Sequence, residues 1–149
     1  MLLCFMGASC TGKSTAAEKL SEINDWKVYT GKEYLKLAKN AGEAAAVFNS
    51  ILQKAALGED NIIYVVSELR DLELIPKQAY RVLFTAELGV MKQRFAERMH
   101  GNLPPAVSAM LERKAVEWSR CPHDLLIESH LYDIAETVEI IRKSLKTEA

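Results

Sequence analysis

Eight residues near the amino terminus combine types and spacing that suit the binding of phosphate. They run Gly7-Ala8-Ser9-Cys10-Thr11-Gly12-Lys13-Ser14, and Thr15 follows them. In a Gly-x-x-x-x-Gly-Lys-Ser segment the glycines adopt backbone angles that strain other residues, so that backbone N–H groups point at phosphate oxygens. We expect Lys13 to reach the outer phosphates, Ser14 to give its hydroxyl to Mg²⁺, and Thr15 to touch an inner phosphate. The pattern therefore predicts that the segment binds a nucleoside triphosphate together with Mg²⁺.

Such a loop needs a strand before it and a helix after it, and the sequence supplies both. Leu2–Met6 is a short apolar run that ends at the first glycine, as a buried parallel strand would. Residues 13–23 then show helical periodicity, and the positive end of this helix would face the phosphates. A glycine-rich turn with no ligand is the alternative, and the flanking strand and helix argue against it.

The elements further along the chain alternate in the same way. We expect strands at residues 27–30, 61–66, 81–85 and 124–128, and helices at 87–99, 105–119 and 131–145. Residues 32–57 are expected to form two helices with a break near Asn40. This alternation predicts an α/β fold with a five-stranded, mostly parallel sheet and helices on both faces. Ligands of such sheets bind beyond the carboxyl ends of the strands.

Composition narrows the class of protein. The chain has 149 residues, is 49% hydrophobic and carries 19 basic against 20 acidic residues, for a net charge of −1. We expect one domain over residues 1–149, with small-molecule nucleotides as partners rather than nucleic acid or a membrane. The three cysteines are scattered and offer no metal-ligand spacing, which favours a cytoplasmic location.

Four segments resemble the cytidylate kinases and, more loosely, other nucleoside monophosphate kinases. Tyr29-Thr30-Gly31-Lys32-Glu33-Tyr34 is similar to the Asp-Thr/Ser-Gly-x-x-Tyr-Arg segment of that family. The resemblance implies that Thr30 and Tyr34 line the pocket for the monophosphate. Leu35 stands where the family has an arginine that binds phosphate.

The segment Ser67-Glu68-Leu69-Arg70-Asp71 resembles the family's Glu-Gly-Arg-Asp sequence, with Leu69 in place of the glycine. The resemblance implies that Arg70 grips the acceptor phosphate and that Asp71 contacts its base or sugar. Glu68 could hold a water molecule bound to magnesium. The alternative is an ordinary strand end stabilised by salt bridges.

Two arginine-bearing segments resemble the family's lid, which we expect at about residues 94–120. Arg94 and Arg98 are four residues apart, so they share one helix face and can converge on anionic oxygens. Arg113 to Arg120 is similar to the family's Arg-Asp-x-x-Asp-x-x-Arg helix, with Lys114 in place of the first aspartate. Glu117 lies between the two arginines and could orient them. A solvated surface is the alternative for any one of these arginines.

The resemblance implies the P-loop kinase fold, a three-layer α/β/α sandwich with a small helical lid. It also implies an ATP-dependent phosphotransferase acting on a nucleoside monophosphate, with CMP or dCMP expected first. Arg70 and Arg113 would hold the acceptor phosphate, while the remaining lid arginines close over the transferring group. Two alternatives stay open. One is a P-loop kinase of another small phosphate- or hydroxyl-bearing metabolite, and the other is a regulatory ATPase without a small acceptor.

Overall fold

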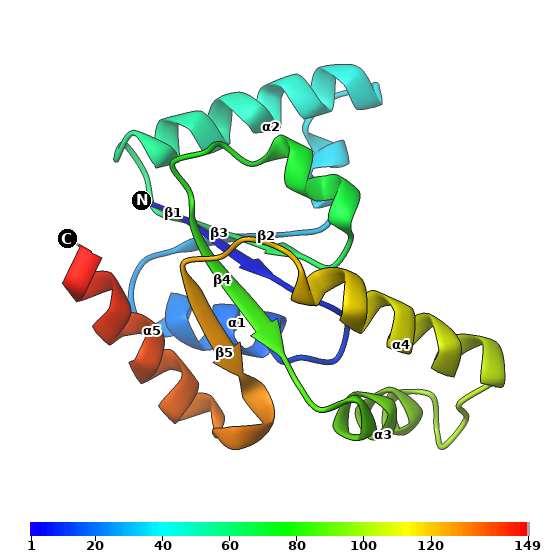
Figure 1. Ribbon diagram of the computed structural model, residues 1–149. Helices are drawn as coiled ribbons and strands as arrows, with labels where there is room; N and C mark the ends of the chain where they lie inside the picture. Colours follow the sequence, from blue (N-terminus) through cyan, green and yellow to red (C-terminus); the bar gives the residue numbers. More distant parts are fainter. Residues whose placement is uncertain (149) are drawn as a thin grey trace.

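The sheet is built from five strands that all run parallel, in the order β2-β3-β1-β4-β5 (Figure 1). The computed structural model describes residues 1–148. The strands are β1 (Leu2–Met6), β2 (Lys27–Thr30), β3 (Ile62–Val66), β4 (Tyr80–Thr85) and β5 (Leu125–Glu128). Every residue of β1 and β3 is buried, because helices cover both faces of a parallel sheet.

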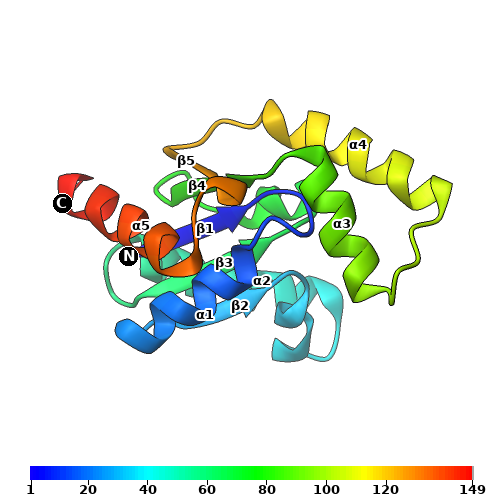
Figure 2. The same cartoon turned by 90° about the horizontal axis from the view of Figure 1, so that it is seen from below.

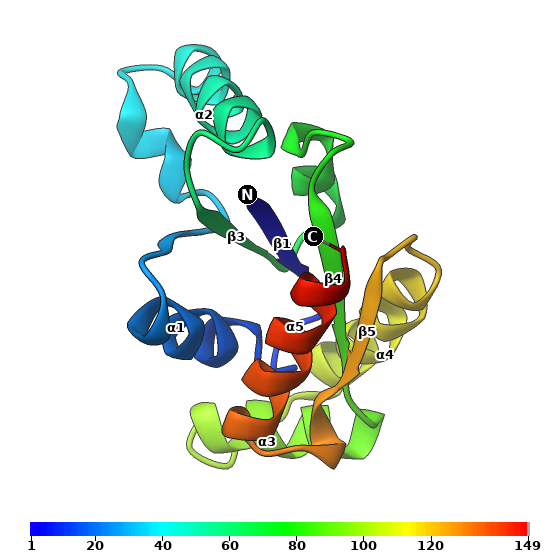
Figure 3. The ribbon, with the colours of Figure 1, turned by 90° about the vertical axis from the view of Figure 1, so that its left-hand side faces the viewer.

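Helices form a layer on each face of this sheet (Figures 1 and 3). In residues 1–148 they are α1 (Lys13–Ile23), α2 (Ala41–Ala56), α3 (Leu88–Arg98), α4 (Pro105–Ser119) and α5 (Ile134–Glu148). Helices α1 and α5 pack on one face, and α2 packs on the other with Trp118 of α4. The predicted α/β/α sandwich is therefore confirmed, with a sheet that is entirely rather than mostly parallel.

Two helical segments differ from the sequence-based expectation, one in its type and one in where it begins. Residues 33–37 form a short 3₁₀ helix, η1 (Glu33–Leu37), instead of an α-helix. None of its side chains is buried, so packing adds little to extend it. The last helix begins at Ile134 rather than at 131, because Asp133 caps it. Asp133 Oδ1 accepts from the Glu136 N–H at 2.8 Å, and Glu136 Oε1 accepts from the Asp133 N–H at 3.2 Å.

Helices α3 and α4 form a hairpin that extends past the carboxyl ends of the strands, beside the loop after β1 (Figures 1 and 2). Lys92 of α3 and Glu112 of α4 join the two helices through an ion pair of 2.6 Å. This hairpin covers the region expected to be a lid, and its role as a lid stays a prediction.

The single domain expected over residues 1–149 also stays a prediction, and its last residue lies outside the described part. None of the helices within residues 1–148 has both the length and the apolar character needed to cross a membrane.

Candidate active site

The loop between β1 and α1 is held against the neighbouring strands by its first glycine. Gly7 donates its backbone N–H to the Val66 carbonyl at 3.2 Å and has a φ of +147°. A Cβ atom at this position would lie 2.3 Å from the Phe84 carbonyl oxygen of β4. Only glycine fits here, because the obstacle is backbone and cannot move aside. The close approach fixes where the phosphate loop leaves the sheet.

Lys13 folds back into this loop. Its ammonium donates to the Ala8 carbonyl at 2.6 Å and to Thr11 Oγ1 at 3.3 Å, and the residue is only 5% exposed. The pKa of Lys13 is lowered to about 7, mainly by burial; Cys10 opposes this shift, and the positive charges of Arg98 and Lys114 contribute to it. The lysine expected to bind phosphate is thus present inside the loop with its charge poorly compensated.

A small pocket of about 90 Å³ follows the loop backbone. The lining residues are Ser9, Cys10, Thr11, Gly12, Lys13, Ser14, Thr15, Ser67 and Arg98. Six of these belong to the predicted loop, Thr15 follows it, and Arg98 reaches the pocket from α3. Ser67, directly after β3, had not been expected here. The structure therefore brings together the loop, one lid arginine and a strand end, as phosphate binding would require.

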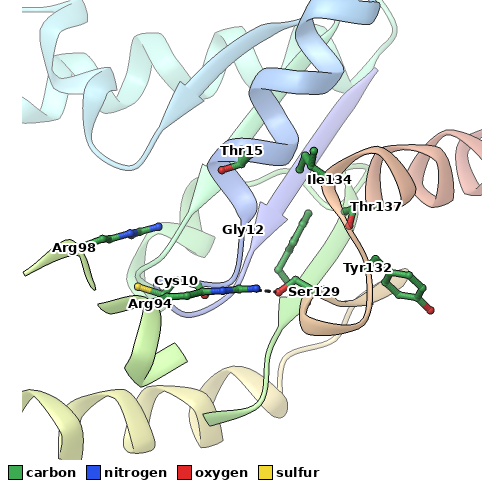
Figure 4. A pocket seen from close by; sticks show the side chains of 10 residues that line it. Cys10, Gly12, Thr15, Arg94, Arg98, Ser129, Tyr132, Ile134 and Thr137 are labelled. Carbon is green, nitrogen blue, oxygen red and sulfur yellow. Dashed lines mark hydrogen bonds between the residues drawn. The ribbon is translucent and has the colours of Figure 1, made fainter. Parts of the chain in front are cut away.

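A second pocket of about 240 Å³ opens beside the loop, towards β5 and α5 (Figure 4). Arg94 of α3 links the loop to the segment after β5. It donates to the Cys10 carbonyl at 3.0 Å and to Ser129 Oγ at 3.4 Å. Ser129 in turn donates to the Thr85 carbonyl at 3.1 Å. Arg98, Tyr132, Ile134 and Thr137 also line this pocket. Its size, its polar and apolar sides and its continuity with the loop suit the sugar and base of a nucleotide.

A third pocket, which we call the acceptor pocket, has a volume of about 170 Å³ and lies between the end of β3 and α4. Its lining residues are Ser67, Glu68, Leu69, Arg70, Lys114, Glu117 and Trp118. Leu69 and Arg70 belong to the 3₁₀ helix η2 (Leu69–Leu74). Lys114 donates to Glu68 Oε1 at 2.7 Å, and this hydrogen bond lowers the pKa of Glu68. Ser67 lines both this pocket and the phosphate-loop pocket.

The other residues predicted to bind the acceptor lie around these pockets rather than in their linings. Tyr34 stacks on Phe48 with ring centroids 5.1 Å apart and an interplanar angle of 6°, so its ring packs against the core. Asp71 is only 4% exposed, and burial raises its pKa. Thr30 is exposed at the end of β2. The binding roles of these three residues stay predictions.

Arg113 lies exposed on α4, and Arg120 lies exposed directly after the last residue of that helix. Neither belongs to the linings of the pockets described above. Glu117 does line the acceptor pocket, next to Lys114 and Trp118. These three residues are spaced i, i+3 and i+4 and therefore share one helix face. The kinase pattern had instead suggested Arg113 and Arg120, which do not lie on this face. The roles expected for Arg113 and Arg120 stay predictions.

The residues around Ser14 fit a magnesium ion that is held mainly by phosphate. Ser14 is exposed and lines the loop pocket, as Ser67 does. Within the described residues, no group of three or more His, Cys, Asp or Glu side chains could hold a metal by itself. Mg²⁺ usually keeps several waters and binds through substrate phosphates and one or two protein oxygens, which matches this sparse donor set.

No model of a known protein family matches this chain, and no curated protein matches it. Solved structures do. A gluconokinase from Sinorhizobium meliloti is 20% identical, with a TM-score of 0.66 over 99% of this chain and 92% of that one. The YorR protein of Bacillus subtilis, in complex with phosphorylated GDP, is 18% identical, with a TM-score of 0.71 over 99% and 97%. A shikimate kinase from Aquifex aeolicus is 17% identical, with a TM-score of 0.60 over 99% and 98%. The chain therefore has the fold of the P-loop kinases.

Proposed function

We propose that this protein transfers the γ-phosphoryl group of ATP to a nucleoside monophosphate, with CMP and dCMP as the first acceptors to test. The observation that carries the proposal is the shared wall at Ser67, where the phosphate-loop pocket meets the acceptor pocket. A donor phosphate in one and an acceptor oxygen in the other would lie side by side, as direct transfer needs. The nucleotide in the YorR structure supports beginning with nucleotides.

The donor would be held by the loop and by residues of α3. Backbone N–H groups of residues 8–14 and the start of α1 favour the negative phosphates. Lys13 would leave the Ala8 carbonyl and turn to the outer phosphates. Arg98 would add charge at the transferring group, while Arg94 holds the loop to the segment after β5. Mg²⁺, held by Ser14 and by phosphate with Glu68 as a partner for its water, would neutralise charge that develops on the phosphate oxygens.

The acceptor would be held by the charged side chains of the acceptor pocket, with Arg70 as the main guanidinium. An oxygen of the acceptor phosphate attacks the γ-phosphorus, and one new P–O bond forms. The bond from the γ-phosphorus to the bridging oxygen breaks, and ADP leaves with that electron pair. Because the attacking oxygen is already anionic, the step requires no general base.

A second candidate is a kinase of a small hydroxyl-bearing metabolite. The observation in its favour is the pair of carboxylates, Glu68 and Glu117, that line the acceptor pocket and could accept hydrogen bonds from hydroxyl groups. Leu35 and Leu69 agree with it, because both depart from the nucleoside monophosphate kinase pattern. The gluconokinase and shikimate kinase neighbours make gluconate and shikimate natural test compounds.

A coupled assay that follows ADP release with a panel of acceptors tests the proposal. The panel contains CMP, dCMP, UMP, AMP, GMP, gluconate and shikimate. We expect turnover with at least one monophosphate. Turnover with the hydroxy acids alone would assign the second candidate. ATP hydrolysis that no acceptor stimulates would indicate a regulatory ATPase.

Arg70→Ala tests the acceptor half. We expect the acceptor KM to rise by about 10- to 100-fold while the KM for ATP stays constant, because Arg70 lines only the acceptor side. Arg142→Ala is the matched control, since Arg142 pairs with Glu139 on α5, away from both pockets. Unchanged kinetics in Arg70→Ala would contradict the acceptor assignment.

A further inference from the structure

The acceptor pocket is lined by an ion pair that joins α4 to the end of β3. Lys114 Nζ lies 2.7 Å from Glu68 Oε1, and Arg70 lines the same pocket. Lys114 is the more buried partner, with 22% of its side chain exposed against 45% for Glu68. The cation is thus fixed in the pocket wall, and the anion is the member that faces water.

Such a pair is easily exchanged. Ion pairs between partly exposed side chains are weak, because water competes for both charges. A phosphate group carries more negative charge than a carboxylate and has three acceptor oxygens. It is therefore the stronger partner for an ammonium group. An anionic acceptor that enters the pocket can therefore take Lys114 from Glu68 at little cost.

Lys114 also lies close enough to the phosphate loop to influence it. Its ammonium and the guanidinium of Arg98 both lower the pKa of Lys13, after burial, which is the largest cause. Lys13 and Arg98 line the phosphate-loop pocket and Lys114 lines the acceptor pocket, so basic side chains of α1, α3 and α4 lie on the two sides of the wall at Ser67. This is the place where two sets of phosphate oxygens would have to approach each other.

We infer that Lys114 binds an anionic group of the acceptor, and that Glu68 holds this lysine only until the acceptor arrives. The inference rests on the proposed function, and it assigns a specificity residue to the acceptor pocket. It restricts the acceptors to molecules that carry a phosphate or carboxylate beside the reacting oxygen. A neutral polyol would leave Lys114 with Glu68 and would bind poorly.

Binding of inorganic phosphate tests the inference directly. The phosphate loop is first filled with a non-hydrolysable ATP analogue and Mg²⁺, so that added phosphate reports on the acceptor pocket. Trp118 lines this pocket, and its fluorescence in a Trp26→Phe background provides the signal. Affinity of each variant for the ATP analogue is measured alongside.

Four variants are compared in this assay. We expect Lys114→Met to weaken phosphate binding by about tenfold and Lys114→Arg to restore it to within about threefold, because arginine keeps the charge. Glu68→Gln should tighten binding by about two- to fivefold, because the competing carboxylate is lost. Lys92→Met is the matched control, since Lys92 makes a comparable ion pair to α4 but lines none of the three pockets described above. It should bind phosphate as the wild type does.

The opposite signs of Lys114→Met and Glu68→Gln decide the matter. If both variants weaken phosphate binding alike, the pair only fastens α4 and the inference is wrong. Failure of the wild-type protein to bind phosphate with the loop filled would also overturn it. Turnover is a separate readout: a protein that binds phosphate through Lys114 but phosphorylates no monophosphate contradicts the proposed function and leaves the inference standing. The Lys114→Arg result keeps the test valid even if Lys114→Met folds poorly.

Discussion

The phosphate loop and the acceptor pocket meet at Ser67, yet one is formed mainly by backbone and the other by side chains. The loop side consists largely of backbone, fixed by the close approach of Gly7 to β4 and by the start of α1. The acceptor side consists of charged side chains on η2 and α4, which are free to differ from one protein to another. A backbone site can bind any triphosphate in the same way, whereas a side-chain site can be changed one residue at a time. The shared fold of kinases with different named substrates fits this division.

Gly7→Ala should have the largest effect on the phosphate loop. The new Cβ would meet the Phe84 carbonyl at 2.3 Å, so β1 or β4 would have to shift. We expect a loss of stability of about 3 kcal/mol or more, together with loss of ATP binding. Urea unfolding and ATP calorimetry measure both. Gly89→Ala is the control, since a Cβ there meets nothing within 4 Å, and its stability should change by no more than about 1 kcal/mol. Equal behaviour of the two variants would contradict the packing argument.

Lys13→Met should separate function from stability. ATP affinity should fall by about 100-fold or more, because the outer phosphates lose their cation. The nucleotide-free protein should become more stable by about 1–3 kcal/mol, because a buried and poorly compensated charge is removed. The Ala8 carbonyl still accepts from Thr11 Oγ1 at 2.8 Å in this variant. Chemical denaturation without nucleotide measures whether the free energy of unfolding rises or falls. A destabilised variant would show that the lysine supports the empty loop.

The two arginines of α3 should differ from each other. Arg94→Met removes two hydrogen bonds that tie the loop to Ser129, so we expect ATP affinity to fall about tenfold and stability to fall by about 1 kcal/mol. Arg98→Met should leave stability unchanged, because the residue is exposed, and should lower kcat instead. Kinetics and unfolding of both variants check this contrast. Similar effects in both would mean that the two residues do not divide these tasks.

ATP binding should depend on pH through Lys13. Its pKa of about 7 in the free protein lies well below the usual 10.5, so bound phosphate must draw a proton onto it. We expect affinity to weaken roughly fivefold between pH 7 and pH 8 from this group alone, with proton uptake visible as a buffer-dependent binding enthalpy. In the absence of nucleotide the unfolded chain keeps this proton up to pH 10.5, so the folded protein gains stability as pH rises from 7 towards 10.5. Lys13→Arg is the control, because arginine stays charged and should remove both trends.

Tyr34→Phe should have the smallest effect. The ring stacks on Phe48, and phenylalanine keeps that contact, so stability should change by less than about 0.5 kcal/mol. If the hydroxyl group touches the acceptor, the acceptor KM should rise about two- to threefold. Tyr34→Ala, by comparison, should cost about 1–2 kcal/mol, because a half-buried ring loses its packing. No change in KM for Tyr34→Phe would restrict Tyr34 to a structural role.

The sequence predicted the loop side well, because its signals are local. A glycine spacing, an apolar run and a helical period each concern neighbouring residues, and the strands and the α/β/α class follow from them. The acceptor side was harder, because spacing along α4 does not reveal which face turns inward. A shift of one position rotates a side chain by about 100° around the helix. This rotation separates Lys114, which lines the pocket, from Arg113, which lies exposed.

Contacts between distant segments also escaped prediction. Ser129 and Thr137 line the second pocket, beside the loop, only because β5 lies beside β4 and α5 returns over the sheet. Ser67 begins the segment that resembles the kinase pattern, but it precedes the matching residues and looks like an ordinary strand end in the sequence. The capping of α5 by Asp133 could have been found, since Asp133 followed by Glu136 matches a known helix-start pattern.

The wall that the phosphate-loop pocket and the acceptor pocket share at Ser67 has a consequence for inhibition. Among residues 1–148, Ser67 alone lines both of them, so the two pockets share a wall at this residue. A compound that links adenosine to an acceptor-like group through a chain of phosphates would occupy both pockets at once. Its second half would bind as an attached group rather than from solution, which raises affinity through effective concentration. The distance bridged by the tightest phosphate chain would then measure, without a crystal, how closely donor and acceptor approach.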